Sequence, residues 1–162
     1  MTIVRLNQEC QQNLILKNAV IYLYKIFNKG CTSTEIGIKM IKALIIDDNM
    51  VNIELLKAYL ELYKIEVIGA ETGKKGVELA QTLLPDAIFM DLLMPSYSWN
   101  GYQATLELKN NPLTKHIPVV AVSSAGDMDL ARDSGCSYFL TRPFEKIILA
   151  KLLQQMGIIA EV

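Results

Sequence analysis

Cysteine and histidine are scarce in this chain of 162 residues, which has three cysteines and one histidine. The cysteines, Cys10, Cys31 and Cys136, are odd in number and far apart, and none belongs to a C-x-x-C pair. This usage favours reduced thiols and a cytoplasmic location over a disulfide framework. With His116 as the single histidine, we expect no zinc site.

Long apolar runs and a large net charge are also lacking. No stretch is long and apolar enough to span a bilayer, and the start of the chain lacks the layout of a signal peptide. The formal net charge of −1 gives no electrostatic case for a nucleic-acid or membrane partner. Neither the P-loop nor the G-x-G-x-x-G pattern occurs, so the usual glycine-rich phosphate-binding loops of nucleotide-binding proteins are excluded.

What the sequence does contain is typical of a globular chain, with 51% apolar and 20% charged residues. From about Lys42 onward, short apolar runs alternate with helical patterns. The predicted strands are Ala43–Ile46, Glu66–Ala70, Ala87–Met90, Val119–Val122 and Tyr138–Leu140. The predicted helices cover Ile53–Tyr63, Val77–Leu84, Tyr102–Lys109, Asp127–Ser134 and a last segment from near Pro143 to Met156. This alternation predicts a parallel sheet with helices on both faces.

The first 39 residues differ from the rest. Leu14–Phe27 is apolar with two interspersed lysines and predicts one helix, and Gly30–Gly37 reads as a linker. A second methionine, Met40, falls just before the first predicted strand. Two interpretations stay open: residues 1–39 are an appended helical extension of a domain at 40–162, or they reflect the choice of an upstream start codon.

Carboxylates follow two of the predicted strands. Asp47 and Asp48 come directly after the first strand, and Asp91 follows the third. If the two strands are neighbours, the carboxylates converge, and two of them at ~4 Å repel by roughly 4 kcal/mol at an effective dielectric of 20. A raised pKa or a bound cation offsets that repulsion, and Mg²⁺ suits a few carboxylates plus water and phosphate. Any one of these aspartates could instead be a helix N-cap.

The chain resembles the response-regulator receiver family over roughly Ile41–Gly157, through five motifs in order. These are Ala43–Asn49 with Asn52, Met90–Pro95, Asn100–Thr105, Ile117–Ser123 and Gly135–Phe144. The resemblance implies a flavodoxin-like (βα)5 fold with five parallel strands in the order 2-1-3-4-5. The chemotaxis receiver, a small member of this family, has that strand order.

The resemblance also implies roles for the matching residues. Asp91 resembles the phosphoacceptor, and Asp47 and Asp48 resemble a pair that holds Mg²⁺ with Asp91 and the backbone carbonyl of Leu93. Ser123 resembles the hydroxyl that bonds the phosphoryl group, and Phe139 resembles the aromatic that moves inward with it. Arg142, with its planar fork, stands where the family usually has lysine, a compact point charge on a flexible stem.

The main interpretation is therefore a single-domain response regulator of a two-component phosphorelay, since only a few residues follow the last predicted helix. It would accept phosphate from a histidine kinase or histidine phosphotransfer protein and bind a downstream protein that the sequence does not identify. It would not be an enzyme beyond transferring the phosphoryl group onto and off Asp91. Transfer of this kind needs mainly alignment and charge stabilisation.

Two alternatives stay open. The first is a pseudo-receiver, an interaction module independent of phosphorylation. It is motivated by Arg142, by a long Pro95–Gly101 loop containing Tyr97 and Trp99, and by a short Ser123–Gly135 segment. The second is a metal-dependent phosphatase, which ranks lower because such enzymes usually carry an acid two residues after the nucleophile, where this chain has Leu93.

Overall fold

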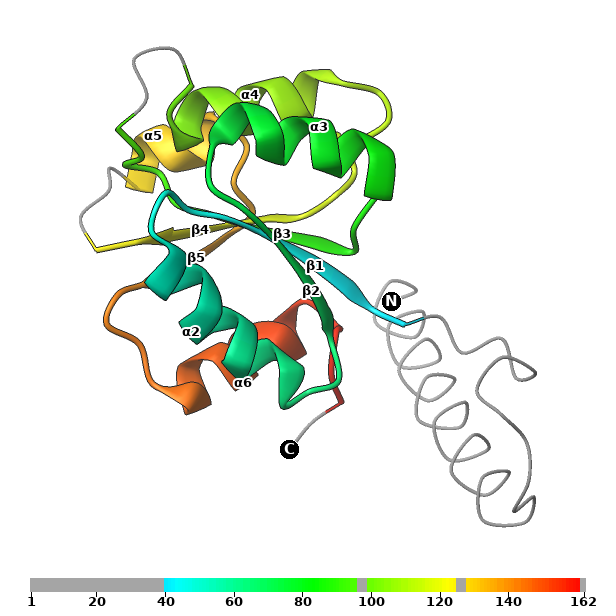
Figure 1. Cartoon of the computed structure of the whole chain (residues 1–162), viewed down its shortest axis with the longest axis vertical. Coiled ribbons are helices and arrows are strands. Elements are labelled where there is room, and N and C mark those ends of the chain that lie inside the picture. The colour runs from blue at the N-terminus through cyan, green and yellow to red at the C-terminus, as the bar shows by residue number, and fades with distance from the viewer. Residues whose placement is uncertain (1–39, 96–98, 125–127, 161–162) are drawn as a thin grey trace, which may run out of the picture. The chain divides into compact units, whose positions relative to one another are not determined.

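The computed structural model describes residues 40–95, 99–124 and 128–160, and within them strands and helices alternate (Figure 1). The strands are β1 (Lys42–Ile46), β2 (Glu66–Ala70), β3 (Ala87–Met90), β4 (Val119–Ser123) and β5 (Tyr138–Thr141). The helices are α2 (Met50–Glu61), α3 (Gly73–Leu83), α4 (Gly101–Asn110), α5 (Met128–Asp133) and α6 (Lys146–Gln155). All five strands lie where the sequence predicts them. The helix predicted at Leu14–Phe27 lies outside the described residues.

The five strands form one parallel sheet in the order β2-β1-β3-β4-β5, which confirms the predicted topology. Ile46, the last residue of β1, pairs with Ala70 on one side and with Met90 on the other. The chain leaves β1 toward β2 and returns to β3 on the opposite side of β1. In open parallel sheets, ligands bind at the carboxyl edge beside such a reversal of strand order.

Helices cover both faces of the sheet: α2 and α6 lie on one face, and α3, α4 and α5 lie on the other (Figure 1). Each face packs its own apolar core against the strands. Leu44, Ile46, Ile88 and Met90 point to the α3–α4 side, whereas Ile45 and Phe89 point to the α2–α6 side. Every residue of β3 is buried, as expected for a central strand covered on both faces.

Three helices begin at the carboxyl edge of the sheet with a polar cap. Asn49 caps α2 and Thr72 caps α3, each accepting a hydrogen bond from a backbone N–H of the first turn. Asn100 begins α4 with a capping box that it completes with Gln103. These caps fix the direction in which the chain enters each helix. The cap of α2, Asn49, directly follows Asp48 and so holds the short loop that carries Asp47 and Asp48.

The last helix departs from the sequence prediction. The sequence predicts a start near Pro143, with Phe144, Ile148 and Leu152 on one face of the helix, but α6 begins at Lys146. The reason is that Arg142 still donates its backbone N–H to the Ser123 carbonyl (3.0 Å), so the chain remains extended there. Residues 142–145 form a loop, with a cis Arg142–Pro143 peptide, and Phe144 packs edge-on against Tyr59 of α2 at 6.1 Å between ring centroids.

Two other helix ends also differ from the prediction. The helix α2 ends at Glu61, so Tyr63 follows it. Leu84, predicted to line the next helix with Val77 and Ala80, is its C-cap with a φ of 45° and is exposed. A left-handed terminal residue turns its side chain away from the helix face that it would otherwise extend.

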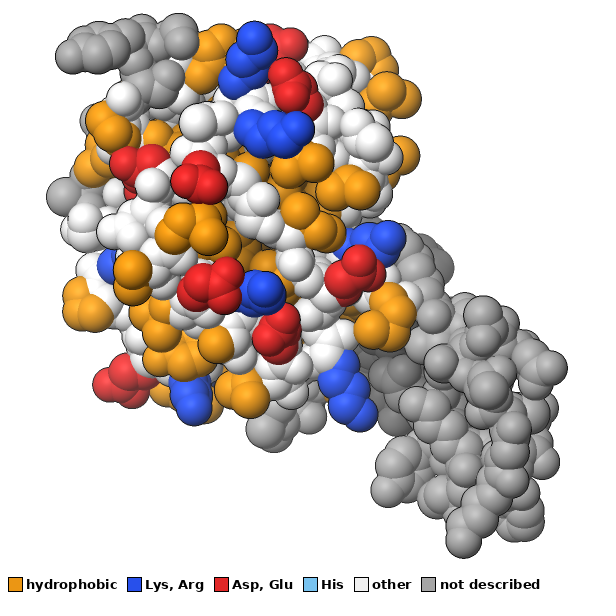
Figure 2. Space-filling view, in the orientation of Figure 1, with side chains coloured by type: hydrophobic (Ala, Val, Ile, Leu, Met, Phe, Trp, Pro, Cys, Tyr) orange, Lys and Arg blue, Asp and Glu red, His pale blue; other side chains and the backbone are white. Residues whose placement is uncertain are grey.

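The surface of the described residues carries charges of both signs mixed with apolar side chains, as the face in Figure 2 shows. Within the described residues, no helix combines the length and the apolar character that a bilayer crossing requires. Cys136 is a buried free thiol, and burial raises its pKa, whereas Cys10 and Cys31 lie outside the described residues. His116 is exposed in a connection, as predicted for a surface histidine.

Candidate functional site

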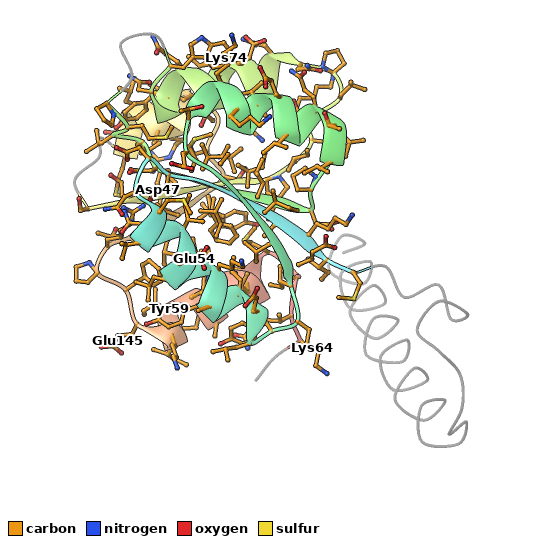
Figure 3. All side chains as sticks on the ribbon, viewed as in Figure 1. Asp47, Glu54, Tyr59, Lys64, Lys74 and Glu145 are labelled. Carbon is orange, nitrogen blue, oxygen red and sulfur yellow. The ribbon has the colours of Figure 1, made fainter. Side chains whose placement is uncertain are left out.

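The three predicted acidic residues converge at the carboxyl edge of the sheet. Asp47 and Asp48 follow β1, Asp91 follows the neighbouring β3, and carboxylate oxygens of all three lie within 4.8 Å of one another. Asp47 is only 1% exposed and Asp91 only 8% exposed, whereas Asp48 faces solvent. Figure 3 shows Asp47 where β1 meets the start of α2. The structure thus brings together the acids that the sequence singled out.

Asp47 is held by hydrogen bonds to both of its carboxylate oxygens. The Asn49 backbone N–H (2.9 Å) and the Asn52 side-chain amide (3.0 Å) both donate to Oδ1. The guanidinium of Arg142 donates to Oδ2 through Nη2. Sequence reasoning placed Asn52 in a motif without giving it a role. Its spacing from Asp47, on the first turn of α2, is the signal that could have revealed the contact.

Asp91 has a less complete set of partners. Its Oδ1 accepts a hydrogen bond from the Leu93 backbone N–H at 3.2 Å, and its Oδ2 lies 3.8 Å from Nη1 of Arg142. Burial raises the pKa of Asp91 above its usual value, and the nearby charges of Asp47 and Asp48 act in the same direction. The Leu93 N–H and Arg142 oppose that rise. Asp91 is therefore a carboxylate whose charge is only partly compensated by its protein surroundings.

Arg142 reaches the acids from the loop after β5. Besides its bond to Asp47, Nη2 donates to the Val122 backbone carbonyl at 3.1 Å. Its side chain is 22% exposed, so the guanidinium lies mostly inside the site. The sequence predicted that Arg142 belongs to this edge, but it could not show that Asp47 is its shortest contact.

Ser123 lies at the end of β4, and Phe139 lies within the neighbouring strand β5. Both line a cavity of about 140 Å³, which is also lined by Leu92, Met128 and Thr141. The Ser123 Oγ is buried and has no hydrogen-bond partner within the described part of the chain. Leaving a buried hydroxyl without a partner costs free energy.

A larger cavity of about 460 Å³ opens beside the acids, between α2 and the loop that precedes α6. Asp47, Asp91 and Arg142 lie at its polar end, and Leu55, Tyr59 and Phe144 are among its apolar lining residues. Figure 3 shows Tyr59 further along α2 from Asp47. Sequence reasoning missed this cavity because it depends on the loop at residues 142–145, which we had assigned to a helix.

The two unusual loops are described only in part, because residues 96–98 and 125–127 lie outside the described segments. Trp99 is partly buried and packs against the core on the α3–α4 face. Its backbone carbonyl lies 2.9 Å from the position that a Cβ would take at Gly73 of α3. The backbone of Trp99 therefore lies close to the start of α3, and the missing side chain of Gly73 permits this close approach.

Comparison with known proteins places this geometry in a family. Residues 43–154, more than half of the chain, match the response regulator receiver domain. The chain belongs to the response-regulator receiver family. Receiver domains are modules of two-component signalling, and the predicted flavodoxin-like (βα)5 fold agrees with this assignment.

Several named response regulators resemble this receiver domain. Protein PilH of Pseudomonas aeruginosa is 35% identical over 117 residues, which cover 70% of this chain and 95% of PilH. The response regulator PleD of Caulobacter vibrioides is 37% identical over 111 residues, which cover 67% of this chain and 24% of PleD. The chain therefore matches about a quarter of the length of PleD.

Solved receiver structures also superpose on this chain. The receiver domain of a sensor histidine kinase from Pseudomonas aeruginosa PAO1, solved with a magnesium ion in its active-site cleft, has a TM-score of 0.67 and 28% identity. The match covers 74% of this chain and 99% of that domain. Chemotaxis protein CheY4 of Vibrio cholerae has the same TM-score at 23% identity, with coverage of 73% and 99%, and supports the fold alone.

The donor set of this receiver domain suits a hard divalent cation. Three carboxylates lie within reach of one ion, and magnesium favours oxygen ligands completed by water. The described residues bring no histidine or cysteine to this cluster, so a softer metal has less to bind. The Leu93 carbonyl stays a predicted ligand, two residues beyond Asp91.

The raised pKa of Asp91 predicts a pH-dependent stability in metal-free buffer. An acid whose pKa is higher in the folded chain binds more protons when folded, so folding loses stability as the pH rises above the usual value of 3.8. Asp91→Asn removes this titration. In urea titrations, we expect the wild type to lose free energy of unfolding relative to Asp91→Asn as the pH rises above about 4. A difference that stays constant or reverses would contradict the raised pKa.

Proposed function

We propose that this chain is a response regulator that accepts a phosphoryl group on Asp91 from a histidine kinase or a histidine phosphotransfer protein, in the cytoplasm. The observation that carries the proposal is the meeting of Asp47, Asp48, Asp91 and the Arg142 guanidinium at one edge of the sheet. Asp91 is the acid that follows the central, fully buried strand, and its Oδ2 lies further from Arg142 than the Oδ2 of Asp47 does.

In the proposed reaction, a carboxylate oxygen of Asp91 forms a bond to phosphorus while the bond from phosphorus to the donor imidazole nitrogen breaks. The electron pair of the broken bond stays on the imidazole, which then takes up a proton, and Asp91 becomes an acyl phosphate. A Mg²⁺ held by Asp47, Asp48, Asp91 and the Leu93 carbonyl would supply neutralisation of the phosphoryl charge. Arg142 would supply further positive charge from the loop after β5.

The response to phosphorylation is proposed to run through Ser123 and Phe139. The buried Ser123 Oγ would donate a hydrogen bond to a phosphoryl oxygen and so gain the partner that it lacks among the described residues. Phe139 lines the same 140 Å³ cavity and could move further into it. A rearrangement of these two residues would change the surface formed by β5 and α5, which a downstream protein would recognise.

The test is phosphorylation of the full chain by acetyl phosphate, a small donor that needs no kinase. We expect intact-mass spectrometry to show one added phosphoryl group in Mg²⁺ and much less in excess EDTA. Treatment with hydroxylamine should remove it, because acyl phosphates are labile to this nucleophile. A modification that survives hydroxylamine would place the phosphate on a hydroxyl and would contradict the proposal.

A second candidate function is a pseudo-receiver that binds partners without phosphorylation. The bond between Arg142 and Asp47 favours it, because a permanent internal cation would leave no place for Mg²⁺. Absence of both Mg²⁺ binding and phosphoryl uptake, with a folded chain, would select this candidate over the first.

A further inference from the structure

The carboxylate of Asp47 has no oxygen that is free of a protein hydrogen bond. Oδ1 accepts from the Asn49 N–H and the Asn52 amide, and Oδ2 accepts from Arg142. The bonds to Oδ1 come from residues of the α2 cap and first turn, so they are part of the helix start. The bond to Oδ2 comes from a side chain that can rotate. Access of a metal ion to Asp47 therefore depends on Arg142.

Arg142 also spans the distance between two of the three acids. Its Nη1 lies 3.8 Å from Asp91 Oδ2, while Nη2 bonds Asp47 Oδ2 and the Val122 carbonyl. The guanidinium thus places its charge between the carboxylates that would hold the metal. With a side chain only 22% exposed, this charge is poorly screened by solvent.

A guanidinium and a divalent cation cannot share these oxygens without strong repulsion. Each is attracted by the same negative charge, and each repels the other at contact distance in a partly buried site. The planar fork of arginine directs Nη2 at Asp47 and Nη1 at Asp91, whereas lysine carries its charge on a single nitrogen. Arginine at this position therefore places positive charge beside both acids.

We propose that Arg142 is an internal counter-ion of the metal site, so that Mg²⁺ binds only as the guanidinium leaves Asp47. The metal affinity of this chain is then set by Arg142 as well as by the carboxylates. The inference rests on the proposed function, because it concerns the same magnesium site. The backbone of Arg142 stays anchored through its N–H to Ser123, so the exchange requires a rotation of the side chain alone.

The experiment is a Mg²⁺ titration of the full chain followed by amide and arginine Nε–H signals in NMR spectra. We expect Arg142→Met, which keeps an unbranched side chain but removes the charge, to bind Mg²⁺ about tenfold more tightly than the wild type. Arg142→Lys should lie between the two. In the wild type, the Arg142 Nε–H signal should shift with the same midpoint as the amides of Asp91 and Leu93.

The matched control is Lys42→Met, which removes the same charge at the opposite end of β1. Lys42 begins that strand and lies near Glu66, whereas Asp47 follows its other end. A separation of about 16 Å along the strand exceeds the Debye length at physiological salt, so we expect less than about a twofold change in affinity. An equal gain in Lys42→Met and Arg142→Met would show a general charge effect and would overturn the inference.

The outcomes separate this inference from the proposed function. Equal or weaker Mg²⁺ binding by Arg142→Met, with a folded spectrum, overturns the counter-ion role and leaves the magnesium site standing. If no variant binds Mg²⁺, the magnesium site itself fails, and the inference fails with it. If Arg142→Met does not fold, the Mg²⁺ affinity of Arg142→Lys and the Arg142 Nε–H signal of the wild type test the inference instead. An Nε–H signal that does not shift when Mg²⁺ binds overturns it.

Discussion

Asp91→Asn is expected to abolish phosphoryl uptake from acetyl phosphate while leaving the chain folded. The asparagine amide keeps the size of the carboxylate and can still accept the Leu93 N–H, but its oxygen is a far weaker nucleophile. Because Asp91 is buried and its charge is only partly compensated, the neutral side chain should not destabilise the fold. Intact-mass spectrometry of wild type and variant, under the same donor and Mg²⁺ concentrations, measures the effect directly.

Asp86→Asn is the matched control for this experiment. Asp86 precedes β3 and Asp91 follows it, so the two aspartates lie at opposite ends of one strand. Asp86 accepts the Lys42 backbone N–H at 2.9 Å, a bond that asparagine can also accept. We expect Asp86→Asn to take up phosphate like the wild type. Uptake by Asp91→Asn at the wild-type level would show that another residue is the acceptor.

Much of the fold could be predicted because buried parallel strands leave a plain signature. Ala43–Ile46 and Ala87–Met90 are short apolar runs that each end in an aspartate, and both became central strands. Since parallel strands end at one edge, that pattern alone brings Asp47 and Asp91 together once the strands are neighbours. The strand order itself came from the resemblance to a family, because alternation of strands and helices is compatible with several orders.

The parts that could not be predicted depend on contacts between side chains from distant segments. The sequence placed Arg142 at the correct edge, but whether it meets Asp47 or Asp91 depends on the loop at residues 142–145. A proline next to a helical pattern is compatible with the first turn of a helix and also with the loop before it. For this reason the sequence predicted that the last helix begins near Pro143, whereas α6 begins at Lys146. The cavity beside Tyr59 was missed for the same reason.

Gly101→Ala is expected to destabilise the chain by about 3 kcal/mol or more, the largest loss of stability that we predict for a single methyl group. Gly101 begins α4 and donates its N–H to the Leu92 carbonyl at 3.2 Å. A Cβ there would lie 2.6 Å from the Leu92 Cα and 2.8 Å from the Asp91 carbonyl carbon, and closer still to the Asp91 carbonyl oxygen. These are backbone atoms of the segment that carries the proposed phosphoacceptor, so they cannot move without displacing the site.

Gly69→Ala is the control that separates this clash from the general effect of replacing glycine. A Cβ at Gly69 of β2 would meet only side-chain atoms, the nearest being Ile53 Cγ2 at 2.8 Å, whereas a Cβ at Gly101 would meet backbone atoms. We expect a smaller loss there, about 1–2 kcal/mol, measured by urea unfolding of both variants. If Gly101→Ala is as stable as Gly69→Ala, the α4 start can move away from the Asp91–Leu92 backbone. The close approach of that helix would then not be what fixes the position of Asp91.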